Sequence, residues 1–211
     1  MIHIKKFDIN KIHYFSGVII SLFIAIHLFN HLMSLFGAAS HIEWMTKLRF
    51  IYRQSIIESI LLIAVGLQIF SGITFYKRFN KINYTGFQKL QIFSGLYLAI
   101  FFLIHVSSVV AGRYLLELDT NFYFGVAGLN TFPFNLFFIP YYLLGINAFF
   151  CHIAAIHHKK MQHTIVRVSP ENQSKSIIIL GIVLSFMILY GLTNHFQGVT
   201  IPPEYNVLIG K

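Results

Sequence analysis

Five apolar stretches, each long enough to cross a membrane as a helix, constrain the fold of this chain more than any other feature. They cover residues 14–36, 55–76, 90–111, 132–156 and 176–195, and charged or turn-forming residues bound each of them. At about 1.5 Å per residue, a helix of about 20 residues spans the roughly 30 Å of hydrocarbon in a bilayer. Because unpaired backbone groups are too costly in lipid, runs of this length are predicted to be helices rather than strands.

The composition excludes a water-soluble protein of this size. Of the 211 residues, 56% are hydrophobic and only 11% are charged. So little charge could not cover so large an apolar content without exposing wide apolar patches to water. No glycine-rich phosphate loop, cysteine-rich zinc pattern or soluble catalytic domain interrupts the spans. We therefore predict one all-α domain, residues 1–211, folded as an integral membrane bundle of five transmembrane helices.

Lysine and arginine residues predict the orientation of the spans, because short cytoplasmic loops are enriched in them. The N-terminal tail, the 77–89 loop and the 157–175 loop together hold eleven of the sixteen: Lys5, Lys6, Lys11, Lys77, Arg78, Lys81, Lys89, Lys159, Lys160, Arg167 and Lys175. We therefore expect the N-terminus in the cytoplasm and the C-terminus outside, in a cytoplasmic membrane of bacterial type. The net charge of +9 then indicates contact with anionic lipids and not with nucleic acid.

An internal repeat singles out two histidines. The sequence Phe-Ser-Gly occurs in the first and third spans, and a histidine follows ten residues after each glycine: Gly17 precedes His27, and Gly95 precedes His105. Both spans run in the same direction, so the two histidines are expected at equal depth in the outer half, about 15 Å beyond their glycines. Two imidazoles that project from two helices into a bundle interior form the arrangement that a b-type haem with two histidine ligands requires. Glycine lets a neighbouring helix or a flat macrocycle approach the backbone.

Several neighbouring residues leave alternatives open. His31 lies one helical turn beyond His27 and is a candidate ligand, a propionate contact or an interfacial polar residue, although depth favours His27. Arg53 and Arg113 are candidates for pairing with haem propionates or for anchoring in lipid headgroups. Glu58, inside the second span, calls for a charged partner, a proton-handling role or an interfacial position. Residues 119–133 are interpreted as an aromatic interface belt or a re-entrant lid.

The chain resembles the five-helix cytochrome b membrane anchor of the succinate dehydrogenase and fumarate reductase family, particularly its single-polypeptide dihaem type. The resemblance covers most of the chain and rests on residues in four places. These are Lys11, His13, Gly17 and His27 in the first span, Leu90, Gln91, Gly95 and His105 in the third, His152 in the fourth, and Val168, Ser169, Pro170 and Gln173 before the fifth.

This resemblance implies roles for the histidines. In the family, the first and third helices hold the haem farther from the soluble subunits, so His27 and His105 would be its ligands. The second haem lies between the second and fourth helices, where His152 matches one ligand but Gln68, four residues before Gly72, stands in place of the other. An amide is a poor iron ligand, so this haem is absent, five-coordinate on His152, or bound by a different residue. The sequence favours a single haem b.

The resemblance also implies a function. The chain would relay electrons between a soluble flavoprotein and iron–sulfur partner on the cytoplasmic side and a quinone in the membrane, without itself carrying out dicarboxylate chemistry. His13 and Ser16 are candidates for contact with the quinone. Two alternatives are a stand-alone haem protein that links quinone to an outer-face acceptor, and a haem-free structural protein whose histidines hydrogen-bond across helices.

Overall fold

The computed structural model describes residues 8–78, 84 and 86–211. Lys5, Lys6 and Lys81, which contribute to the charge bias above, lie outside these residues. In the described ranges the regular secondary structure is helical, apart from one isolated bridge between Ile165 and Val168.

Five long helices dominate the chain. They are α1 (Ile9–Leu32), which the 3-10 turn η1 (Met33–Phe36) continues, α3 (Ser55–Lys77), α4 (Gly86–Tyr114), α6 (Asn135–Lys160) and α7 (Pro170–Leu192). Each is long and apolar enough to cross a membrane. The prediction of an all-α fold with five helices able to span a membrane is therefore confirmed for the described residues.

Some helices begin or end several residues away from the limits of the apolar runs, because polar residues cap them. The Asp8 carboxylate accepts a hydrogen bond from the Asn10 backbone at 3.0 Å, so α1 begins five residues before the apolar run. The Ser169 hydroxyl caps α7 in the same way, through the Asn172 backbone at 3.3 Å. At its other end α7 stops at Leu192, because residues 194–196 adopt left-handed φ angles of 48°, 58° and 64°.

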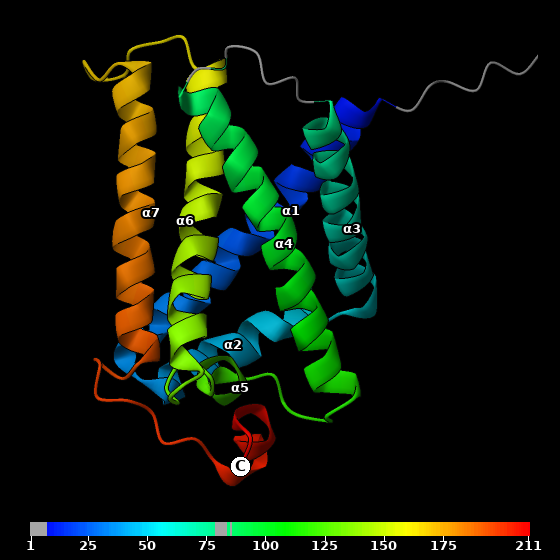
Figure 1. The fold of residues 1–211 in the computed structure, drawn as a ribbon, viewed down its shortest axis with the longest axis vertical. Coiled ribbons are helices and arrows are strands. Elements are labelled where there is room, and N and C mark those ends of the chain that lie inside the picture. The colour runs from blue at the N-terminus through cyan, green and yellow to red at the C-terminus, as the bar shows by residue number, and fades with distance from the viewer. Residues whose placement is uncertain (1–7, 79–83, 85) are drawn as a thin grey trace, which may run out of the picture.

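The five helices close into a ring in which α1 packs on α3, α3 on α4, α4 on α6, α6 on α7, and α7 on α1. We call the end at which α1, α4 and α7 begin the open end. At the opposite end lie the short helices α2 (Ala38–Tyr52), α5 (Phe122–Val126) and η2 (Pro203–Ile209), which the sequence did not predict (Figure 1). We call this the capped end.

The cap packs against the bundle. Phe122, Val126 and Leu129 are at most 2% exposed and form one core cluster with Ile188 and Leu192 of α7. The 119–133 segment therefore fills the capped end, and its aromatic Phe122 is buried where the belt interpretation placed it at the lipid interface.

Hydrogen bonds tie the cap together. Arg49 of α2 pairs with Asp119 at 2.7 Å, and the Tyr205 hydroxyl of η2 donates to the Asp119 carbonyl at 3.0 Å. Arg53 donates to the Thr120 hydroxyl at 2.6 Å. These bonds join α2, η2 and the segment before α5, so the three short helices form one closed layer over the end of the bundle.

Gly191 of α7 packs directly against the backbone of η1. A methyl group there would lie 2.8 Å from the Leu35 nitrogen and 2.9 Å from the Ser34 carbonyl carbon. Gly191→Ala is therefore expected to lower the free energy of unfolding by about 1–3 kcal/mol, because neither backbone atom can move aside cheaply. Thermal unfolding in one fixed detergent measures this.

The matched control is Gly66→Ala in α3, where an added methyl group meets no atom within 4 Å. It should leave stability unchanged or raise it by up to about 1 kcal/mol, because alanine is the better helix former. Equal losses in the two variants would contradict a specific contact at Gly191.

Candidate functional site

Two imidazoles of different helices meet near the capped end. His27 of α1 and His105 of α4 have ring centroids 6.1 Å apart, with their planes at 71°. Two imidazoles that bind one metal ion from opposite sides, with metal–nitrogen distances of about 2 Å, have centroids about 6 Å apart. The observed separation therefore suits an ion held between the two rings.

His105 has no competing hydrogen bond. Its ring stacks on Phe101 at 5.2 Å with an interplanar angle of 11°, and the described part of the chain offers its nitrogens no hydrogen-bond partner. Both ring nitrogens are therefore free to bind a metal ion. A pair of imidazoles is the donor set of a b-type haem iron, so the His27–His105 pair fits this group.

A chain of hydrogen-bonded imidazoles, His27–His31–His41, connects α1 to the short helix α2. His27 Nε2 lies 3.0 Å from His31 Nε2, and His31 Nδ1 lies 3.2 Å from Nε2 of His41 on α2. His31 thus has both ring nitrogens engaged, whereas His27 has one free, which favours His27 over His31 as a ligand. Binding through His27 Nε2 requires its bond to His31 to be exchanged for the metal bond.

At the α2 end of this chain, His41 and Asn30 each have a buried polar atom without a partner. The Asn30 amide lies 3.2 Å from His41 Nε2, and these two residues are only 5% and 2% exposed. Asn30 Oδ1 and His41 Nδ1 have no partner among the described residues. The four-residue spacing of His27 and His31 is visible in the sequence. The position of His41 beside His31 is not, because it depends on the reversal of the chain at Gly37, where φ is 96°.

His41 is expected to make the capped end sensitive to acid. Burial, and then the nearby charges of His27 and Arg49, lower the pKa of His41 from 6.5 to about 4. Since the unfolded chain binds this proton near pH 6.5 and the folded chain only near pH 4, stability falls as the pH drops through that window. The total loss is about 3 kcal/mol.

We therefore expect the thermal midpoint to decrease between pH 7 and pH 4.5, and His41→Gln to flatten this decrease. Thermal unfolding in detergent at both pH values measures it. His163→Gln, on an exposed loop at the open end, is the control and should keep the wild-type dependence. A His41 variant as acid-sensitive as the wild type would show that other groups are responsible.

The predicted arginines differ in what they bind. Arg113 pairs with Glu58 of α3, which gives the carboxyl group of the second span its partner. Arg53 has only the Thr120 hydroxyl and no acidic partner in the described structure. Burial, and then the charges of Arg49 and Arg113, lower the pKa of Arg53. Arg53 is therefore the arginine left free to neutralise an anionic group.

The two repeat glycines face polar side chains near the open end. A methyl group at Gly17 would lie 3.4 Å from the Gln68 amide nitrogen, and one at Gly95 would lie 3.0 Å from His152 Cε1. Gln68 therefore occupies the same position relative to Gly17 as His152 does relative to Gly95. The structure therefore brings the predicted residues together in two groups, one near each end of the bundle.

A network around Gln68 joins α1 to α3. The Ser16 hydroxyl donates to Gln68 Oε1 at 2.7 Å, and the Gln68 amide lies 3.2 Å from His13 Nε2. His13 Nδ1 lies 2.8 Å from the Ser71 hydroxyl. Sequence reasoning noted His13 and Ser16 but missed Ser71, because its role appears only once α1 and α3 are packed together.

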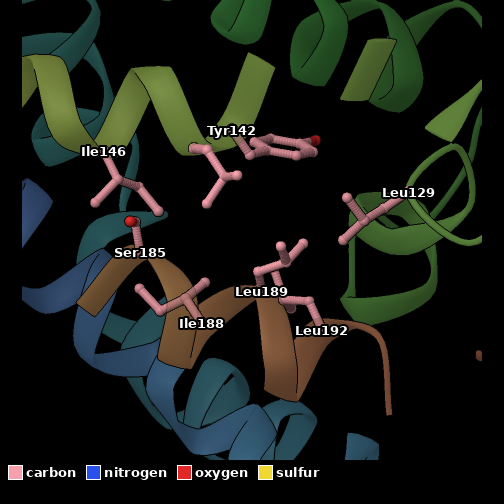
Figure 2. A pocket seen from close by; sticks show the side chains of 8 residues that line it. Leu129, Tyr142, Ile146, Ser185, Ile188, Leu189 and Leu192 are labelled. Atoms are coloured by element: carbon pink, nitrogen blue, oxygen red, sulfur yellow. The ribbon is translucent and has the colours of Figure 1, made fainter. Parts of the chain in front are cut away.

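Other places in the described structure are poorer candidates. No group of three or more His, Cys, Asp or Glu side chains there has an arrangement that would hold a metal ion. A cavity of about 10 Å³ lies between α6 and α7 and leaves room for about one water molecule. Figure 2 shows the side chains that line it. Its lining is mostly apolar: Leu129, Tyr142, Leu143, Ile146, Ser185, Ile188, Leu189 and Leu192. It is therefore a gap in core packing.

Comparisons with known proteins give no relative. No protein-family model, curated protein or solved structure matches this chain. A functional assignment therefore rests on the residues of the site and on their geometry.

Proposed function

We propose that this protein is the haem b-containing membrane subunit of a succinate:quinone reductase or fumarate reductase-like complex. The observation that carries the proposal is the His27–His105 pair, whose ring centroids lie 6.1 Å apart between α1 and α4. Imidazoles from two helices are the usual protein ligands of a membrane haem of this type.

The surrounding residues support this assignment. His27 and His105 would bind the iron, and Arg53 would neutralise a propionate. The α2 and α5 helices exclude water from this end, because Phe122 and Val126 close over the bundle. A b-type haem held in such a site accepts and donates single electrons, and burial among apolar side chains tunes its potential.

The partners follow from the charge of the two ends. The open end carries the exposed Lys159, Lys160 and Lys175, and the excess of basic residues there favours a cytoplasmic position in a bacterial-type inner membrane. A soluble flavoprotein and iron–sulfur partner would dock on this side. Membrane quinone would exchange electrons within the bilayer, with His13 and Ser16 as candidate contacts.

A stand-alone haem protein is the second candidate function. It is favoured by the hydrogen-bonded chain His27–His31–His41, which connects the proposed haem site to the capped end. An acceptor on the outer face would bind at that end. The haem-free alternative is favoured by the same His27–His31 bond, which engages one predicted ligand. Co-purification of flavoprotein and iron–sulfur subunits from native membranes separates the first candidate from the second.

The decisive test is the reduced-minus-oxidised spectrum of the purified full chain, together with its pyridine haemochrome. A low-spin b-type spectrum is expected. Absence of haem from folded protein would overturn the proposal and leave the haem-free alternative.

A further inference from the structure

A phenylalanine extends the internal repeat of the first and third spans. Phe23 and Phe101 each lie six residues after the repeat glycine and four residues before the histidine, which is His27 in one span and His105 in the other. Residues four apart on a helix lie on the same face, one turn above the other. The repeat therefore places a flat apolar ring beside each of the two proposed iron ligands.

Both phenylalanines stack on the neighbouring imidazole. The Phe101 and His105 ring centroids are 5.2 Å apart with an interplanar angle of 11°, and those of Phe23 and His27 are 5.6 Å apart at 22°. The second side-chain torsion of histidine has broad energy wells, so the helix alone does not fix the plane of the ring. A parallel aromatic contact does, because turning the imidazole gives up the stacked arrangement. The contact covers a face of the imidazole and not the edge that carries its nitrogens.

The α6 helix holds Phe101 in place. The Tyr141 ring stacks on it at 4.7 Å and 26°, and the Tyr141 hydroxyl donates to the Phe101 carbonyl oxygen at 3.3 Å. Gly145, one turn further along α6, lets the phenyl ring lie directly against the backbone, because a methyl group there would come within 2.5 Å of Phe101 Cε2. Phe101 is therefore fixed from the side of α6, and it restrains the His105 ring in turn.

A different helix contacts Phe23. Tyr52 of α2 meets the Phe23 ring edge to face, with ring centroids 5.4 Å apart and planes at 81°. The two phenylalanines thus have separate neighbours, α2 for one and α6 for the other. The two imidazoles stacked on them are also oriented separately, and their planes cross at 71°.

We infer that Phe23 and Phe101 are positioning residues, which hold the His27 and His105 imidazoles so that iron bound between them has crossed ligand planes. The inference rests on the proposed haem function, but it concerns residues that are not ligands. In low-spin ferric haem, crossed ligand planes raise the largest g value and the reduction potential above those of parallel planes. Side chains that orient a ligating histidine in this way tune the metal without binding it.

The test is Phe101→Leu in the full chain purified with its haem, read by electron paramagnetic resonance and by redox titration. Leucine is apolar but has no flat face, so the His105 plane is released. The largest g value and the midpoint potential should both fall, and the haem affinity should decrease about tenfold. Phe101→Tyr keeps a flat ring and should keep the wild-type g value. Phe102→Leu changes the adjacent residue, which meets Phe101 edge to face, and should also leave the g value unchanged.

A second variant displaces the same ring from a different helix. Gly145→Ala pushes the Phe101 ring aside without altering the stacked side chains themselves, and it should shift the g value in the same direction as Phe101→Leu. Its matched control is Gly181→Ala in α7, where the added methyl group collides with Phe150 of α6. This control should lower the stability of the protein and leave the g value unchanged.

Phe23→Leu and Phe23→Tyr repeat the comparison at the other ligand, and they decide the inference if Phe101→Leu does not fold. A wild-type g value in both Phe101→Leu and Gly145→Ala, or in Phe23→Leu, overturns the role of that phenylalanine and leaves the proposed function intact. An equal shift in Phe102→Leu or Gly181→Ala overturns the inference, because the signal then responds to any packing defect. A wild-type chain without haem overturns the proposed function as well.

Discussion

Replacing His105 by alanine is expected to abolish the low-spin signal of the haem proposed at the capped end. The ring is one of two proposed ligands of that iron, and within the described residues no other imidazole comes from α4 to replace it. The one remaining histidine would not hold a haem in a low-spin form. The low-spin signal of this haem should vanish from the reduced-minus-oxidised spectrum, and His27→Ala should have the same effect.

Two controls sharpen this result. His195→Ala changes a histidine of the same end, outside the site, whose Nε2 lies 3.4 Å from the Leu35 carbonyl, and it should leave the spectrum unchanged. His152→Ala should spare the capped-end haem. His105→Gly should recover the low-spin signal when imidazole is added. If six-coordinate haem survives in both His27→Ala and His105→Ala, the assignment of these ligands is wrong.

Replacing Glu58 by leucine is expected to destabilise the protein by about 3 kcal/mol, because it leaves the Arg113 guanidinium without a counter-charge near the end of a membrane span. The two side chains are only 25% and 20% exposed in the folded chain. Arginine cannot lose its proton, whereas a carboxyl group left alone can gain one. Arg113→Leu should therefore cost only about 1 kcal/mol.

The double variant Glu58→Leu, Arg113→Leu completes the cycle. It should be within about 1 kcal/mol of the wild type, because removing both charges leaves nothing unpaired. Denaturation of the purified proteins in one detergent at pH 7 measures all four species. Equal losses in the two single variants would show that the pair acts by packing and not by charge.

The sequence predicts the five spans well because the pattern that specifies them is local. A run of about 20 apolar residues needs a helix in lipid, whatever its neighbours are. The cap could not be predicted in the same way. The α2 helix carries the exposed pair Glu43 and Lys47 beside the apolar Met45, and such a short mixed segment is also typical of a loop. Its helical form depends on packing against α1 and α5.

In the candidate site too, local patterns could be predicted from the sequence and contacts between packed helices could not. The equal spacing from glycine to histidine, together with the common direction of two helices, predicts that His27 and His105 face each other. The contacts of His13 with Ser71 and Gln68 are different, because they depend on which helix packs against α1. That neighbour is set by ring order and tilt, which the sequence does not express. The family pattern directed attention to Gln68, the residue that now contacts His13.

The order of helices in the ring has a consequence for biosynthesis. The α1 helix has α7 as one of its two ring neighbours, yet 137 residues separate the end of α1 at Leu32 from the start of α7 at Pro170. At a synthesis rate of about 5–20 residues per second, α1 waits on the order of ten seconds for this neighbour. The first four spans therefore enter the bilayer as an open arc, with one side of α1 and of α6 facing lipid. The arrival of α7 closes the arc, so a bulky group that binds between α1 and α4 has its widest entrance while the ribosome is still translating the last span.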